Sequence, residues 1–172
     1  MTIYTVGHST RPLDDFLALL KAHAIVQLAD VRTVPKSRRH PHFAGDALAH
    51  SLPAAGVAYR HFPGRGGLRK PRRDSRNAAW RNDSFRGYAD YMETDEFERA
   101  LDALSAWSAP RTAVMCAESV WWRCHRQLIA DALVARGIEV RHIGSGTSAP
   151  VHTLTEFARV DEKRRVTYPG LL

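Results

Sequence analysis

The stretch of residues 112–126 reads T-A-V-M-C-A-E-S-V-W-W-R-C-H-R. Its first residues form a short apolar run, which predicts a buried strand that ends at Cys116. From His125 onward, apolar side chains recur with the i, i+3, i+4, i+7 spacing of one helical face. The pattern predicts a strand, a short loop and a helix, with Cys116, Glu118, Cys124 and His125 gathered at the junction.

Segments that predict strands and helices alternate along the rest of the chain. Apolar runs at 3–6, 25–31, 57–62 and 138–143 predict strands. Helices are predicted behind Pro12 and at 43–51, 85–92 and 96–107, with Thr94 as a candidate N-cap. Nearly continuous apolar strands that alternate with helices are typical of a parallel sheet covered on both sides. We therefore predict an α/β fold with a mostly parallel sheet and helices on both faces, a Rossmann-like three-layer arrangement.

The chain of 172 residues suits one hydrophobic core, and we predict a single α/β domain over residues 1–172. Two segments show no apolar periodicity, a long basic loop at 63–83 and a polar tail at 144–172. Loops of this length inside a compact domain are usually functional or disordered.

Composition narrows the class of protein. Hydrophobic residues make up 44% of the chain, which argues against disorder. No apolar run approaches the ~20 residues of a membrane-spanning helix, so we expect no membrane partner. The chain has two cysteines and no pattern typical of a signal peptide, which favours free thiols in a reducing compartment. We expect a cytoplasmic protein.

Positive charge is concentrated in two segments. The formal net charge is +7, and the stretch 60–86 holds nine Arg or Lys against two acidic residues. A second cluster, Lys-Ser-Arg-Arg, lies at 36–39. Such clusters favour an anionic ligand, for example nucleic acid or a nucleotide. A solvated surface loop explains them equally well. Aromatic residues between 80 and 91 are interleaved with arginines, which suits either base stacking or simple helix packing.

Polar residues follow the predicted strands at the points where the strands end. In a parallel sheet these ends lie along one edge, where ligands bind. We therefore expect one rim that carries His8, Ser9, Asp30, Arg32, Cys116, Glu118 and His142.

The same motifs carry a resemblance to a known family. The chain resembles the bacterial and archaeal family called domain of unknown function 488 over roughly residues 2–145. The motifs are Gly7-His8-Ser9, Asp30-Val31-Arg32 with Pro35 and Ser37, Cys116-Ala117-Glu118 with Cys124-His125-Arg126, and His142-Ile143. The resemblance implies an α/β domain whose polar residues gather at one site, and it implies no particular activity.

Cys116 is the candidate nucleophile, with His125 as its base and Arg126 as the group that attracts an anion. Cys124 is expected to be packed and slow to react, and a purely structural Cys116 is the alternative. The Cys-x5-Arg loop of thiol phosphatases is not matched, because Arg123 lies seven positions after Cys116. Asp30 and Glu118 are candidate acid–base groups, or they pair with arginines.

The candidate substrate-binding residues are His8, Ser9, Arg32, Ser37, Arg126 and His142. The alternatives are a helix cap for Ser9 and buried structural roles for the histidines. Cysteine and histidine at this junction are possible zinc ligands, but their spacing does not match structural zinc motifs, and we predict neither metal nor cofactor. A disulfide between Cys116 and Cys124 requires the loop between them to fold back.

Three functions follow from these patterns. The first is a hydrolase or transferase that acts on a phosphorylated or nucleic-acid substrate at the strand-end rim. The second is a non-catalytic module that binds nucleic acid or nucleotides, and the third is a thiol- or metal-dependent sensor domain. The sequence leaves open whether the protein is an enzyme.

Overall fold

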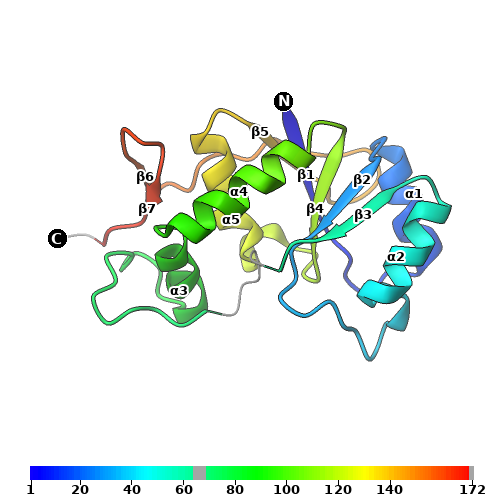
Figure 1. Ribbon diagram of the computed structural model, residues 1–172, viewed down its shortest axis with the longest axis horizontal. Helices are drawn as coiled ribbons and strands as arrows, with labels where there is room; N and C mark the ends of the chain where they lie inside the picture. The colour runs from blue at the N-terminus through cyan, green and yellow to red at the C-terminus, as the bar shows by residue number, and fades with distance from the viewer. Residues whose placement is uncertain (64–68, 171–172) are drawn as a thin grey trace.

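The computed structural model describes residues 1–63 and 69–170, and its centre is a five-stranded sheet (Figure 1). The strands lie in the order β3-β2-β4-β1-β5, and each neighbouring pair is parallel. Their bounds are Thr2–Gly7 for β1, Gln27–Asp30 for β2, Ala58–His61 for β3, Thr112–Cys116 for β4 and Glu139–His142 for β5. The predicted parallel sheet is confirmed.

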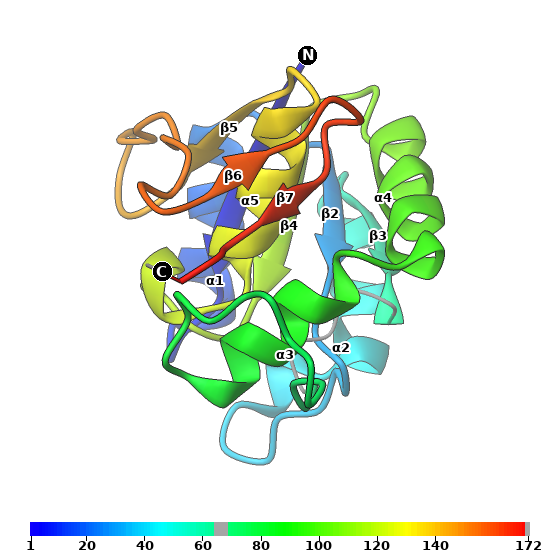
Figure 2. The same ribbon diagram turned by 90° about the vertical axis from the view of Figure 1, so that its left-hand side faces the viewer.

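Helices cover both faces of this sheet (Figures 1 and 2). The helices are α1 Leu13–Ala22, α2 Gly45–Ala54, α3 Asp83–Tyr91, α4 Asp95–Trp107 and α5 Arg126–Ala135, with short 3-10 helices η1 Pro41–Phe43 and η3 Trp121–Arg123. One core joins α1 and α2 to the sheet face of Val6, and the other joins α4 and α5 to the face of Ile3. Burial of both faces explains the nearly continuous apolar strands. The predicted three-layer α/β fold is confirmed.

The connection that follows β1 runs along one face of the sheet, and the connection that follows β4 runs along the other face. The chain passes from β1 through α1 to β2, and from β4 through α5 to β5. Because β1 and β4 are neighbours, the topological switch point of the sheet lies between them. Gly7 pairs with Cys116 at this point, so the end of β4 occupies the place where open α/β sheets bind ligands.

The basic loop includes residues 64–68, which lie outside the described residues. Its described part is anchored on α3 by the carboxylate of Asp90. This carboxylate accepts hydrogen bonds from the Arg72 backbone at 2.8 Å, from Ser75 Oγ at 2.6 Å and from Asn77 Nδ2 at 2.8 Å. Asn77 is fully buried, so this part of the basic loop belongs to the folded body.

The aromatic residues near the basic loop serve the core. Tyr88 and Tyr91 are buried, and Trp80 packs edge-on against Phe157 and Tyr168. The structure therefore supports helix packing for these side chains rather than a stacking surface for bases.

The C-terminal tail contributes packing that the sequence patterns do not reveal. It forms an antiparallel pair, β6 Arg159–Val160 with β7 Val166–Thr167, which lies over α5 in Figure 2. Tyr168 and Val166 are buried in the same core as α5. Within the described residues, no helix has the length and apolar character needed to cross a membrane.

Candidate functional site

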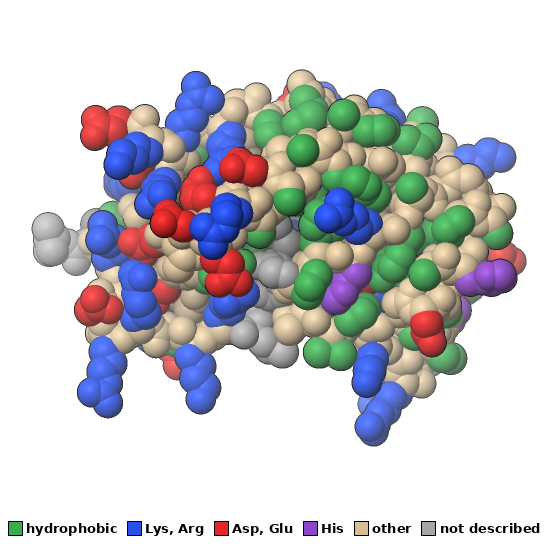
Figure 3. Space-filling view, in the orientation of Figure 1, with side chains coloured by type: hydrophobic (Ala, Val, Ile, Leu, Met, Phe, Trp, Pro, Cys, Tyr) green, Lys and Arg blue, Asp and Glu red, His purple; other side chains and the backbone are tan. Residues whose placement is uncertain are grey.

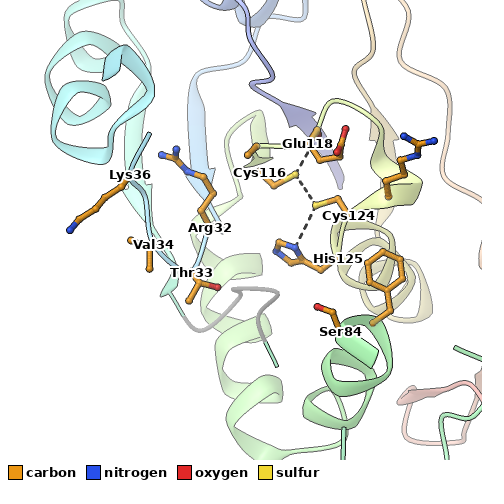
Figure 4. Close-up of a pocket in the computed structure, with 12 residues that line it drawn as sticks. Arg32, Thr33, Val34, Lys36, Ser84, Cys116, Glu118, Cys124 and His125 are labelled. Carbon is orange, nitrogen blue, oxygen red and sulfur yellow. Dashed lines mark hydrogen bonds between the residues drawn. The ribbon is translucent and has the colours of Figure 1, made fainter. Parts of the chain in front are cut away.

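A pocket lies at the carboxyl ends of β2 and β4 (Figure 4). Its volume of about 390 Å³ falls within the range of small-molecule sites. Cys116 and Cys124, named here the thiol pair, line the pocket together with His125. The other lining residues are Arg32, Thr33, Val34, Lys36, Ser84, Phe85, Ala117, Glu118 and Arg123.

The end of β1 holds the loop of residues 117–123, which we call the site loop. The backbone N–H of His8 donates to Cys116 O, and that of Ser9 donates to Ala117 O, both at 2.9 Å. A Cβ on Gly7 would lie 1.8 Å from the carbonyl oxygen of Glu118, so only glycine allows the site loop to pass this closely. Gly7 thus fixes the path that brings the chain back from Cys116 to Cys124.

The site loop folds back and brings the two thiols into direct contact. Cys124 Sγ lies 2.8 Å from Cys116 Sγ, and Cys116 Sγ lies 3.5 Å from the Glu118 carbonyl oxygen. His125 Nδ1 lies 3.4 Å from Cys124 Sγ, and the dashed lines of Figure 4 show these groups as one chain. The cysteines are free, and their exposed fractions are 3% for Cys116 and 7% for Cys124.

The surroundings favour a thiolate on Cys124 rather than on Cys116. A hydrogen bond from the Cys116 thiol lowers the pKa of Cys124, and His125 and Arg126 lower it further. Desolvation by burial raises the pKa of Cys116 well above its ordinary value, and the bond to Cys124 adds to this. These directions favour Cys124 as the thiolate, whereas the sequence pattern favoured Cys116, and which thiol reacts stays a prediction. When the pair loses the first of its two protons, the remaining proton stays on Cys116 and Cys124 carries the negative charge.

His125 is placed to exchange a proton with Cys124. It is the N-cap residue of α5, so its ring stands beside Cys124 at the amino end of the helix. Nε2 is buried and has no hydrogen-bond partner within residues 1–63 and 69–170.

Arg126 supports the site from behind instead of binding an anion. Its exposed fraction is 1%, and it donates to the carbonyl oxygens of Glu118 at 2.6 Å and Ser119 at 3.2 Å. The guanidinium is enclosed and does not line the pocket, which favours a supporting role over the predicted contact with an anion. Its charge still acts on the thiol pair through space.

His142 belongs to a buried hydrogen-bonded chain and not to the pocket. Its Nδ1 lies 2.6 Å from Thr5 Oγ1, and its Nε2 lies 2.8 Å from His152 Nδ1. His152 continues to Asp131, which also accepts from the Tyr168 hydroxyl, each at 2.8 Å. Burial lowers the pKa of His142 to about 3, so its ring is neutral.

This buried chain ends on the arginine that holds the site loop. Arg126 donates to Thr5 Oγ1 at 3.2 Å. The guanidinium of Arg126 can only donate hydrogen bonds. When both imidazoles are neutral, each following bond of the chain, as far as Asp131, then has one donor and one acceptor. This arrangement favours a positioning role for His142, which does not line the pocket, over the predicted role in substrate binding. Sequence reasoning missed Thr5, Asp131 and His152, whose polar side chains interrupt apolar segments and give no motif.

Asp30 and Arg32 form a buried ion pair. Arg32 Nε lies 2.9 Å from Asp30 Oδ1 and Arg32 NH2 lies 2.7 Å from Oδ2, while the Tyr59 hydroxyl donates to Oδ2 at 2.6 Å. Asp30 has no exposed surface, which favours the alternative of a partner for Arg32 over the acid–base role. Arg32 does line the pocket, as the sequence predicted for a rim residue.

His8 packs beneath Arg32 and is not a pocket residue. Its ring stacks on Phe43 at 4.3 Å, its Nδ1 donates to Ser9 O at 2.8 Å, and Arg32 NH1 lies 3.4 Å from its Nε2. Burial lowers the pKa of His8 to about 4, which leaves the ring neutral. These contacts favour the alternative of a buried structural role for His8, in support of Arg32, over contact with substrate.

The remaining predicted residues occupy the margin. Glu118 is exposed at the pocket mouth, where its carboxylate accepts from Val120 N at 3.3 Å. Ser37 Oγ accepts from His40 N at 3.1 Å and lies in a neighbouring depression rather than in the pocket. Ser9 does not cap α1, whose N-cap is Pro12.

Cationic side chains surround the pocket entrance. Arg32, Lys36 and Arg123 line it, against one lining carboxylate among the described residues, that of Glu118. Figure 4 shows Lys36 directed away from the thiols, so its charge acts at the entrance. Figure 3 shows further Lys and Arg side chains projecting from the lower edge of the molecule. Among the described residues, no three His, Cys, Asp or Glu side chains are grouped to hold a metal ion.

These features define a class: a parallel α/β protein with a hydrogen-bonded thiol pair at the switch point of its sheet, enclosed by cationic residues. The family model described as Domain of unknown function DUF488 matches residues 12–133, and the chain belongs to this family. The resemblance inferred from the motifs is thereby confirmed. Comparisons with curated proteins and with solved structures found no match.

Proposed function

We propose that the protein is a thiolate-dependent hydrolase or transferase that acts on a small phosphorylated substrate, with Cys124 as the nucleophile. The observation that supports this most is the contact of Cys124 Sγ with the Cys116 thiol and His125 Nδ1 in one pocket. Together these neighbours favour a thiolate at neutral pH, and a thiolate is the reactive form of cysteine.

The proposed step forms a covalent intermediate on Cys124. Its sulfur attacks phosphorus, the bond from phosphorus to the leaving oxygen breaks, and that oxygen takes the proton held by His125. Water then attacks the phosphorus of the cysteinyl phosphate in a hydrolase, whereas an acceptor hydroxyl does so in a transferase. In either case the thiolate leaves, and the attacking oxygen returns a proton to His125.

The choice of substrate rests on charge and size. Lys36 and Arg123 at the pocket entrance attract anions, whereas the charge of Arg32 is balanced by Asp30. A volume of about 390 Å³ lies near the lower end of the range for ligand pockets, which favours a small phosphorylated molecule over a polymer. Part of the positive charge of the basic loop is neutralised, because Arg72 and Arg76 pair with Glu93.

The test compares three aryl esters: p-nitrophenyl phosphate, bis-p-nitrophenyl phosphate and the neutral p-nitrophenyl acetate. We expect turnover of a phosphate ester that exceeds that of the acetate, and a loss of at least about 100-fold in Cys124→Ser. Binding of inorganic phosphate, measured by calorimetry, should persist in that variant. Turnover that survives Cys124→Ser, or phosphate binding without turnover of either phosphate ester, would overturn the proposal and favour a binding module.

A further inference from the structure

We infer that Cys116 and Cys124 form a reversible dithiol–disulfide couple that reduces peroxides, in which Cys124 reacts first and Cys116 closes the disulfide. The observation that carries the inference is the separation of the two sulfurs, 2.8 Å, at the wall of an open pocket. This activity requires the reactive Cys124 of the proposed function but not its phosphorylated substrate.

The geometry allows closure with little movement. A disulfide has an S–S length of about 2.05 Å, so the two sulfurs need to approach by less than about 1 Å. Cys116 ends β4 and Cys124 directly precedes His125, the N-cap of α5, so two regular elements hold the sulfurs. The site loop between them is already folded back by Gly7 and Arg126. The ordering that a disulfide normally imposes on a loop is thus present in the reduced protein.

The surroundings select a small oxidant. The thiols are 3% and 7% exposed at the wall of the pocket, where a peroxide needs to bring only one oxygen to Cys124. Cys124 has the lower pKa and is the thiolate that attacks. Cys116, which remains a thiol, is the only other cysteine of the chain and is already in contact.

The chemistry balances with a peroxide as oxidant and a dithiol as reductant. The Cys124 thiolate attacks one peroxide oxygen, the O–O bond breaks, and the departing hydroxide or alkoxide takes a proton from His125. The resulting sulfenic acid on Cys124 is attacked by the sulfur of Cys116; the S–O bond breaks, and the hydroxide leaves as water with the proton of Cys116. Two thiols thereby lose two electrons, and the peroxide gains them. A dithiol returns both thiols by exchange.

The sequence allows a direct readout, because trypsin separates the two cysteines. Cleavage at Arg111, Arg123 and Arg126 places Cys116 in peptide 112–123 and Cys124 in peptide 124–126. After treatment of the full-length protein with hydrogen peroxide, non-reducing mass spectrometry should show these peptides joined, with the loss of two hydrogens. Dithiothreitol should separate them again. This readout on the wild-type protein does not depend on the folding of any variant.

Two variants test the order of the steps. Cys116→Ser should retain sulfenic acid on Cys124, which dimedone labels, whereas Cys124→Ser should consume peroxide at least about tenfold more slowly than the wild type. Free thiols after excess peroxide, or a disulfide only between molecules, would overturn the couple. Fast alkylation of Cys124 without the joined peptides would overturn it and leave the phosphoryl-transfer proposal standing. Joined peptides without turnover of the aryl phosphates would support the disulfide couple and overturn the phosphoryl-transfer proposal.

Discussion

At the scale of single residues, His125 places one ring nitrogen beside the thiol of Cys124. Nδ1 lies 3.4 Å from Cys124 Sγ, and this contact helps to lower the pKa of the thiol. We expect His125→Asn to raise the pKa of Cys124, because the thiolate loses both a hydrogen bond and a nearby positive charge. Thiolate absorbance at 240 nm, followed across pH, measures the shift. Its midpoint should rise by about one unit or more.

His50 provides the matched control, because it is exposed on α2 and remote from the pocket. His50→Asn should leave the absorbance midpoint unchanged. A midpoint that moves equally in both variants, or in neither, would show that His125 does not stabilise the thiolate.

Asp30 gives a second prediction at this scale. Asp30→Asn removes the charge that balances the buried Arg32, and it should lower the free energy of unfolding by about 3 kcal/mol. Denaturant titration measures the loss. Glu139→Gln, which breaks an exposed pair with Arg141, should change stability little. An Asp30→Asn protein as stable as the wild type would mean that the ion pair is dispensable.

Residue types were easier to predict from the sequence than residue roles. Cys116, Cys124 and His125 do meet at the pocket, because strand ends and helix starts follow from apolar periodicity. The surroundings favour the opposite assignment of the two cysteines, because their pKa order depends on burial and on a loop that folds back. Neither the burial of a thiol nor the path of the loop can be read from the spacing of residues in the sequence.

At the scale of elements, the end of β1 determines the path of the site loop. Gly7→Ala would place a Cβ against the Glu118 backbone and push the loop away from β1. We expect a loss of roughly 2 kcal/mol in stability and slower alkylation of Cys124, because the thiol contacts depend on this loop. Thermal unfolding and peptide mass spectrometry give the two readouts.

Gly144→Ala is the control for this change, because a Cβ there meets no atom within 4 Å. It should leave both readouts at the wild-type value. Equal behaviour of Gly7→Ala and Gly144→Ala would show that the close approach at Gly7 is not required.

Strands and helices with strong periodicity were predicted to within a few residues, as for β4 and α4. The elements that the sequence did not reveal are short. The 3-10 helix η3 and the pair β6–β7 owe their conformation to packing, η3 beside His142 and the pair beside α5. Segments of two or three residues have no periodicity to detect.

At the scale of the whole molecule, two buried histidines connect stability to pH. His8 has a pKa of about 4 and His142 of about 3, both below the ordinary 6.5. Unfolding therefore takes up protons below pH 6.5, and stability falls as pH decreases toward about 4. The slope should approach roughly 1.4 kcal/mol per pH unit for each histidine. Denaturant titrations at several pH values measure it.

His142→Asn should flatten this dependence by about half, and His50→Asn should not alter it. A dependence that is unchanged in His142→Asn would show that this histidine is not the group that takes up a proton on unfolding.

The central claim is that Cys124, and not Cys116, carries the reactive thiolate. Alkylation with iodoacetamide across a pH series, read on peptides 112–123 and 124–126, tests it most directly. We predict that at pH 6.5 Cys124 is modified at least about tenfold faster than Cys116, since its thiolate persists below the ordinary thiol pKa of ~8.5. Faster modification of Cys116, or equal and slow modification of both, would contradict the account.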